Sequence, residues 1–161
     1  MGYYHTAQIC LNGHVITDSY DKNPEFRQNY CDKCGQPTIT KCPNCNSNIR
    51  GDYECNNVVS IGFSTPAPNF CYNCGKPFPW TKDSLDSIQE LLSLESTLEA
   101  SELEYLNSNL PSILTDTPKT KLVATKLKLA LGKLGSTASS AIHDIIVDVA
   151  SETAKKIIFP E

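Results

Sequence analysis

Hydrophobic positions in the second half of the chain recur at the spacing of an α-helix. Apolar residues fall three or four positions apart over residues 80–106, 118–134 and 137–158, so each stretch presents one apolar face. The phase of the first pattern shifts around residues 99–102, where we expect a bend or a break. The pattern therefore predicts about three helices after residue 80.

The first half of the chain predicts short strands. Its extended stretches are rich in Tyr, Thr, Ile and Val and are interrupted by Gly, Asn, Asp and Pro. They cover residues 3–11, 15–20, 37–41 and 48–53. Residues 56–69, which include two prolines, predict an irregular connection.

Composition divides the chain at the same place as the hydrophobic pattern. Residues 1–80 hold all eight cysteines and nearly all the aromatic side chains. Residues 81–161 are rich in Leu, Ala, Ile, Ser, Lys and Glu. We expect two domains with these bounds and an α+β fold, with the β-rich part first and an all-α tail after it.

Charges are distributed unevenly along the chain. There are 14 Lys and Arg residues against 18 Asp and Glu, which gives a net charge of −4. The signs are balanced in residues 1–80, the helix expected at 80–106 is acidic, and the helix expected at 118–134 carries lysines and no acid. We expect the basic helix to pack against the acidic one or against another subunit; a surface for nucleic acid or an acidic partner is the alternative.

Eight potential metal ligands stand in four close pairs within the first half. Cys and His side chains separated by two or three residues can bind one tetrahedral ion, and four such pairs complete two shells without an open position. The pairs are Cys10 with His14, Cys31 with Cys34, Cys42 with Cys45, and Cys71 with Cys74. We therefore expect tandem zinc ribbons that hold two structural Zn²⁺ ions per chain.

An internal repeat indicates how the pairs combine. Residues 30–37 and 70–77 share one pattern: an aromatic residue, Cys, two variable residues, Cys, Gly, one variable residue and Pro. An opening pair followed by a closing pair, twice over, favours sequential sites. These are Cys10, His14, Cys31 and Cys34 in the first site, and Cys42, Cys45, Cys71 and Cys74 in the second. In the alternative, a cross-braced RING-like arrangement, the first pair joins the third and the second joins the fourth.

The turns at these pairs have suitable residues. Gly35 and Gly75 follow the second cysteine of their pairs, where the backbone often needs a positive φ that glycine adopts without a Cβ clash. Asn46 takes the corresponding position in the third pair, and Gly13 lies within the first. We expect all four turns to form locally.

A disulfide framework is the main alternative interpretation of the cysteines. Three Cys-x-x-Cys pairs, a partnering histidine and no secretory signal favour metal in a reducing compartment, which predicts a cytoplasmic protein. Cys55 lies outside every pair. A lone cysteine is most often a small buried hydrophobic residue, and a reactive thiol or substitute ligand is the alternative.

The motifs at residues 10–14, 31–35, 42–45 and 70–80 together resemble a family of small bacterial proteins of unknown function with a double zinc ribbon followed by a helical tail. The resemblance covers the first half of the chain closely and the tail in outline. It implies a bacterial cytoplasmic protein with two metal ions. It implies no particular activity.

From these features we expect a zinc-binding adaptor. Its ribbons would recognise a protein partner, and its helical tail would mediate oligomerisation or docking. Nucleic acid is a possible partner but is not favoured, because the balanced charge of the first half lacks a basic footprint. One alternative is a RING-like scaffold that assists a protein-modifying enzyme, and another is a membrane-acting effector that uses the last helix.

Catalytic residues are not assigned. The sequence has no phosphate-binding loop, no nucleophile motif and no zinc site with an open position. We favour a non-enzymatic role and leave an enzymatic one open. Charges interrupt every apolar run, so no transmembrane segment is expected.

Overall fold

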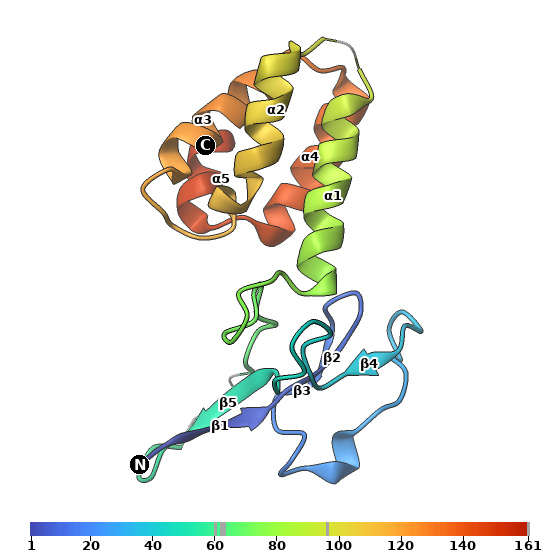
Figure 1. Cartoon of the computed structure of the whole chain (residues 1–161), viewed down its shortest axis with the longest axis vertical. Helices are drawn as coiled ribbons and strands as arrows, with labels where there is room; N and C mark the ends of the chain where they lie inside the picture. The colour runs from blue at the N-terminus through green and yellow to red at the C-terminus, as the bar shows by residue number, and fades with distance from the viewer. Residues whose placement is uncertain (60, 62–63, 96, 161) are drawn as a thin grey trace. The chain divides into compact units, whose positions relative to one another are not determined.

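The computed structural model divides the chain into two compact units (Figure 1). It describes residues 1–59, 61, 64–95 and 97–160. We call Met1–Lys82 the ribbon unit and Asp83–Glu161 the helical unit. Small antiparallel sheets lie in the first and helices in the second, so the protein has the expected α+β fold.

The ribbon unit contains two small sheets. Strands β1 and β5 form a two-stranded antiparallel sheet, and a three-stranded antiparallel sheet has the order β3-β2-β4. The strands are β1 (Tyr3–Thr6), β2 (Gln8–Cys10), β3 (Val15–Thr17), β4 (Thr38–Ile39) and β5 (Arg50–Glu54). Strands β1 to β4 fall within the stretches predicted from composition, and β5 extends one residue beyond the stretch predicted at 48–53.

A bulge lies in the β1–β5 sheet. Tyr4 pairs with Tyr53 and Thr6 pairs with Arg50, so β5 has one more residue than β1 between these two pairs. The extra residue reverses the alternation of side chains, and Arg50 therefore lies on the same face as Tyr53. Gly51 permits this geometry, because a Cβ there would overlap with the backbone carbonyl of Asp18.

The ribbon unit has a small apolar core. Phe78 and Trp80 stack with their ring centroids 4.8 Å apart, and the Trp80 indole donates a hydrogen bond of 2.9 Å to the carbonyl of Pro68. The buried cluster around these rings comprises Ala7, Ile9, Cys42, Ile49, Cys71, Phe78 and Trp80. Two metal-ligand candidates are thus part of the core itself.

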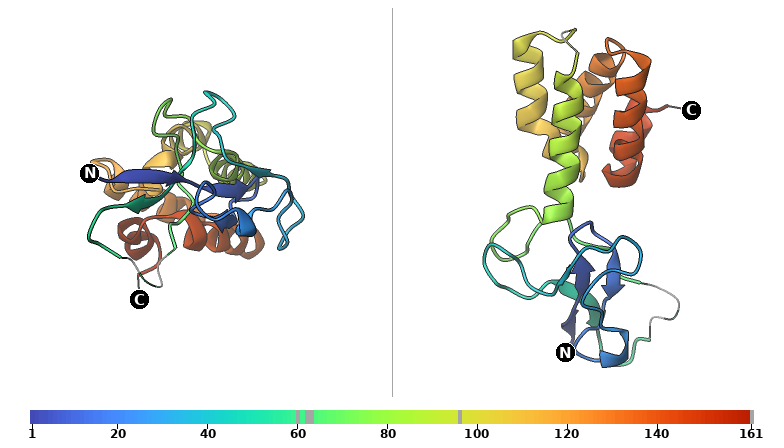
Figure 2. Two further views of the ribbon diagram at one scale, coloured as in Figure 1. Left: turned by 90° about the horizontal axis from the view of Figure 1, so that it is seen from below. Right: turned by 90° about the vertical axis from the view of Figure 1, so that its right-hand side faces the viewer.

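The helical unit is built from more helices than the expected three. Its α-helices pack around buried leucine and isoleucine side chains, with α3 against both α5 and α2 (Figure 2). The α-helices are α1 (Pro79–Ser93), which begins within the last residues of the ribbon unit, α2 (Ala100–Asn109), α3 (Thr120–Leu131), α4 (Ser136–Val149) and α5 (Glu152–Ile158).

The helix boundaries differ from the expected ones at two places. The first apolar stretch ends as a helix at Ser93, ahead of the predicted phase shift, and a new helix begins at Ala100. The last stretch is divided at Ser151, whose backbone N–H donates to Ile113 and whose hydroxyl accepts from Ala154 at the start of α5. A tertiary hydrogen bond and a helix cap thus override a continuous helical pattern.

Residues 107–117, which lie between the first two stretches of helical pattern, are largely ordered by burial. They contain a 3₁₀-helix at Leu110–Ile113, and Leu110 and Ile113 are fully buried. Within the described residues, no helix is long and apolar enough to cross a membrane. Three residues of the expected irregular connection, 60, 62 and 63, lie outside the described residues.

Candidate metal centres

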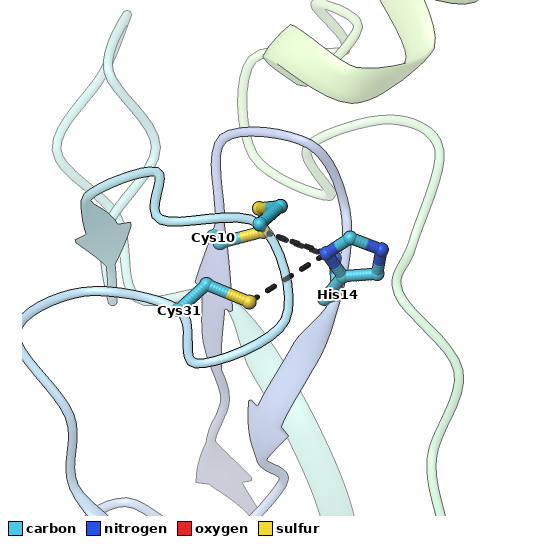
Figure 3. A group of neighbouring side chains, drawn as sticks. Cys10, His14 and Cys31 are labelled. Atoms are coloured by element: carbon cyan, nitrogen blue, oxygen red, sulfur yellow. Dashed lines mark hydrogen bonds between the residues drawn. The ribbon is translucent and has the colours of Figure 1, made fainter.

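The first cluster joins Cys10, His14, Cys31 and Cys34. Figure 3 labels the first three of these residues. Their candidate ligand atoms all lie within 4.8 Å of one another. His14 Nδ1 lies 3.4 Å from Cys10 Sγ and 3.6 Å from Cys31 Sγ, and the sulfur atoms of Cys10 and Cys34 are 3.6 Å apart. Ligands about 2.0–2.3 Å from a central zinc ion at tetrahedral angles would be separated by about 3.3–3.8 Å. The cluster therefore has the dimensions of a tetrahedral zinc shell.

The second cluster consists of Cys42, Cys45, Cys71 and Cys74. The sulfur atoms of Cys42 and Cys74 are 3.8 Å apart, and those of Cys45 and Cys71 are 3.6 Å apart. These separations again match the edges of a tetrahedral thiolate shell, about 3.8 Å. All eight cysteines of the chain are free thiols, so neither cluster is a disulfide pair.

The grouping is sequential. Each cluster takes one opening pair and the closing pair that follows it, as the internal repeat favours. A cross-braced RING-like arrangement would place Cys10 and His14 together with Cys42 and Cys45, and the structure puts these pairs in different clusters.

The internal repeat is also a repeat of backbone structure. Tyr30 bridges Pro37 in the first closing turn, and Phe70 bridges Pro77 in the second. The N–H of Cys31 donates to the carbonyl five residues later at 2.8 Å, and its counterpart in the second repeat does the same at 2.9 Å. The shared sequence pattern thus specifies one closing turn, used once in each cluster.

The predicted turn residues have the predicted backbone conformation. The φ angles are +92° at Gly13, +77° at Gly35, +65° at Asn46 and +74° at Gly75. In the closing turns this conformation lets the N–H of Gly35 donate to the carbonyl of Cys31 at 2.8 Å. These angles bring the two cysteines of a pair to one side of the turn.

The thiols of each cluster differ in acidity. Hydrogen bonds from the side chain and backbone of Ser47 lower the pKa of Cys45 to about 6, whereas burial raises the pKa of Cys42 to about 11. In the first cluster, the backbone N–H of Gln36 is the main cause that lowers the pKa of Cys34 to about 6. The partly exposed thiols of Cys34 and Cys45 are thus more acidic than the buried thiol of Cys42.

Cys55 is the one cysteine that joins neither cluster. It directly follows the last residue of β5 and is partly buried. Its sulfur lies 3.7 Å from the carbonyl oxygen of Asn56. All eight predicted ligands, by contrast, are brought together in fours.

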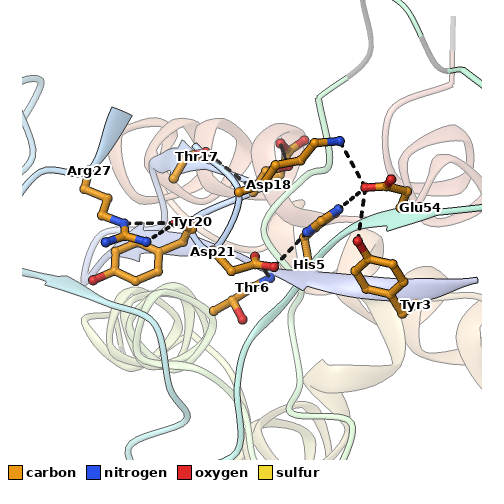
Figure 4. A network of polar contacts seen from close by, with 11 residues as sticks. Tyr3, His5, Thr6, Thr17, Asp18, Tyr20, Asp21, Arg27 and Glu54 are labelled. Atoms are coloured by element: carbon orange, nitrogen blue, oxygen red, sulfur yellow. Dashed lines mark hydrogen bonds and ion pairs between the residues drawn. The ribbon is translucent and has the colours of Figure 1, made fainter. Parts of the chain in front are cut away.

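A polar network around His5 was not anticipated from the sequence (Figure 4). His5 is only 3% exposed; its Nδ1 lies 2.8 Å from Asp21 and its Nε2 lies 2.5 Å from Glu54. Glu54 also accepts hydrogen bonds from Tyr3 and Lys22. The partners of His5 lie 16 and 49 residues away in sequence, so no local motif marks them.

The acidity of His5 follows from this network. Burial by itself lowers the pKa of His5, but the hydrogen bonds and negative charges of Asp21 and Glu54 outweigh it and hold the pKa above the ordinary value of 6.5. Both ring nitrogens are engaged, so the side chain ties β1 to β5 and to the loop that carries Asp21.

A family comparison covers both units of the chain. Residues 3–158 match a family described as an uncharacterized protein conserved in bacteria (DUF2321). The chain belongs to this family. The DUF2321 match includes all eight clustered ligands and the five α-helices, in agreement with the resemblance noted from the motifs. No curated protein and no solved structure matched the chain significantly.

Proposed function

We propose that this protein is a zinc-binding adaptor. Two structural Zn²⁺ ions would fold the ribbon unit, the ribbon unit would recognise a protein partner, and the helical unit would mediate self-association or docking. The observation that carries the proposal is the pair of four-ligand clusters, one with three cysteines and a histidine and one with four cysteines.

The donor sets support zinc in a structural role. Thiolate and imidazole ligands in fours are typical of structural zinc sites, whereas a catalytic zinc keeps one position for water or substrate. Four protein ligands in each cluster fill a tetrahedral shell, so the ion would hold the fold and would not activate a bound molecule. Reduced, metal-binding thiols also support a cytoplasmic location.

The location of the clusters supports a role in folding. The first connects Cys10 on β2 to the loop before β4, and the second connects the segment after β4 to the segment before α1. A unit with so small an apolar core gains little stability from burial alone. Structural zinc supplies on the order of 10–16 kcal/mol in peptide systems, enough to fold such a unit.

Charge and exposure support protein partners. Basic and acidic residues are balanced in the ribbon unit, without the basic footprint that phosphate binding requires. On α3 of the helical unit, Leu122 and Leu129 are 52% and 63% exposed and lie two turns apart. Exposed leucines flanked by Lys121 and Lys128 suit an interface with another subunit or a partner protein.

Native mass spectrometry of the purified chain tests this proposal. We expect two zinc ions per chain and a defined oligomer or a retained protein partner. The double variant Leu122→Gln/Leu129→Gln should keep both ions and lose the oligomer or partner. A chain with fewer than two metal ions, or a monomer with no partner under any condition, would contradict the adaptor function.

A further inference from the structure

An exposed arginine lies among tyrosine rings on the ribbon unit. The guanidinium carbon of Arg50 is 4.5 Å from the ring centroid of Tyr4 and 3.8 Å from that of Tyr72. Tyr53 extends the group, with its ring centroid 4.9 Å from that of Tyr4. The three rings are between 49% and 55% exposed. We call these four residues the arginine cradle.

Two features of the fold assemble the cradle. The bulge in β5 places Arg50 on the face of the sheet that carries Tyr4 and Tyr53, which regular alternation would not do. Tyr72 comes from the closing turn of the second cluster, between Cys71 and Cys74. The cradle therefore joins the β1–β5 sheet to a metal-binding turn.

The side-chain hydrogen-bond donors of Arg50 have no acceptor among the described residues. Within that part of the chain, the Arg50 guanidinium makes no hydrogen bond and no ion pair, and it contacts only the rings of Tyr4 and Tyr72. A guanidinium has five N–H donors in one plane, and contacts with aromatic rings leave these donors available. The side chain is held in position by the rings, so little conformational freedom is lost when an acceptor binds.

A second arginine in the same unit provides a contrast. Arg27 also stacks on a tyrosine, with its guanidinium carbon 4.1 Å from the ring centroid of Tyr20. Its Nε and Nη2 donate to the backbone carbonyl of Tyr20 at 2.9 and 2.7 Å. Arg27 thus uses its donors to hold its own loop, whereas the side chain of Arg50 donates to none of the described residues.

The chemistry of the cradle favours a carboxylate. Carboxylates match the planar donors of arginine in a two-bond geometry, and Tyr and Arg are the residues most enriched among the energetically dominant contacts of protein interfaces. A nucleic-acid backbone fits less well, because the unit carries no basic stripe that would follow successive phosphates. At the cradle, an acidic protein segment can pair one carboxylate with the Arg50 guanidinium and pack its apolar parts on the exposed tyrosine rings.

We infer that the arginine cradle is the docking point for an Asp or Glu side chain of an acidic segment in a partner protein. The inference rests on the proposed adaptor function and names the residues through which the ribbon unit acts. Arg50 binds the carboxylate, and the tyrosine rings hold Arg50 and contact the apolar parts of the segment.

Titration of the zinc-loaded full chain with an acetylated hexaglutamate peptide, followed by ¹H–¹⁵N NMR, tests the inference. We expect shifts at the Arg50 side-chain N–H and at the amides of Tyr4 and Tyr72. Arg50→Ala should weaken binding about tenfold, the usual scale of a lost charge-assisted hydrogen bond. Arg50→Lys should lose most of the affinity and Tyr72→Phe should keep it, because planarity and the ring are the features used.

Arg27→Ala is the matched control, since it removes another exposed, ring-stacked cation whose donors are already engaged. The inference is overturned if the wild-type chain does not bind hexaglutamate, if Arg50→Ala leaves the affinity unchanged, or if Arg27→Ala weakens it equally. Tighter, Arg50-dependent binding of hexathymidylate would assign the cradle to nucleic acid instead. Failure here with two zinc ions and a partner still present leaves the adaptor function standing; loss of zinc from the wild-type chain refutes that function.

Discussion

At the scale of single residues, the candidate ligands are not interchangeable with the one remaining cysteine. Cys74 lies in a closed group of four, whereas Cys55 lies outside both groups. We expect Cys74→Ser to reduce the zinc content from two ions to one and to unfold its own ribbon, because three ligands leave the shell open. Cys55→Ser should retain both ions. Native mass spectrometry of the two variants decides this, and full zinc occupancy in Cys74→Ser would make the ligand assignment wrong.

His5 makes the stability of the ribbon unit depend on pH. Its pKa is raised in the folded protein, so protonated His5 stabilises the fold below its unfolded pKa and this contribution is lost as the pH rises through the folded pKa. The hydrogen bonds from His5 and Lys22 lower the pKa of Glu54. The stability that ionised Glu54 contributes is therefore lost as the pH falls, and only in the acid range. We expect His5→Gln to destabilise the zinc-loaded protein by about 1–2 kcal/mol near pH 6, allowing for partly exposed carboxylates, and by less near pH 9.

Urea unfolding of wild type and His5→Gln at several pH values measures this difference. His143→Gln, which removes an exposed histidine of the helical unit, is the matched control. A difference in stability between wild type and His5→Gln that stays constant with pH would show that His5 is not held protonated by its two carboxylates.

At the scale of elements, the sequence specifies the turns that carry the candidate ligands but not how the strands pair. Each turn is local: two ligands and a glycine or Asn46 with positive φ lie within five positions, so spacing alone predicts it. The bulge beside Gly51 depends on the backbone of Asp18, and the division between α4 and α5 depends on the carbonyl of Ile113. These partners are distant in sequence, so a periodic pattern of hydrophobic residues cannot predict them.

Gly51 tests whether the bulge is required. A methyl group there would overlap with the carbonyl of Asp18, where Asp52 N–H now donates at 2.9 Å. We expect Gly51→Ala to push β5 away from this loop and to cost about 1–3 kcal/mol, as overpacking usually does. The same change should disturb the NMR signals of Arg50 and its neighbouring tyrosines.

Gly132→Ala is the control for this change. Gly132 follows α3 with an ordinary helical φ of −67°, and the nearest atom to an added Cβ would be 3.4 Å away. Alanine should be tolerated or slightly stabilising there. Equal urea midpoints for wild type and Gly51→Ala would show that the loop adapts and that the bulge does not need glycine.

At the scale of the whole molecule, the two units are stabilised by different physics. The helical unit buries many aliphatic side chains in its own core, including Ile88, Leu92, Leu106, Leu127 and Ile142. The ribbon unit has fewer apolar side chains, and its two ligand clusters connect its loops. We therefore propose that the two units, divided near residues 80–82, are separately folding domains, as composition predicts.

Removal of metal from the intact chain is the test of that proposal. The ribbon unit has only a small apolar core and contains both ligand clusters. A zinc chelator should therefore collapse the ¹H–¹⁵N NMR signals of residues 1–78 into the narrow range of an unfolded chain. The signals of the helical unit should keep their dispersion, since its core contains no candidate ligand. Added zinc should restore the dispersed signals of residues 1–78. Collapse of both sets of signals would mean that the chain folds as one cooperative unit. Persistence of both would mean that metal is not what folds the ribbons, and the structural role proposed for zinc would then fail with it.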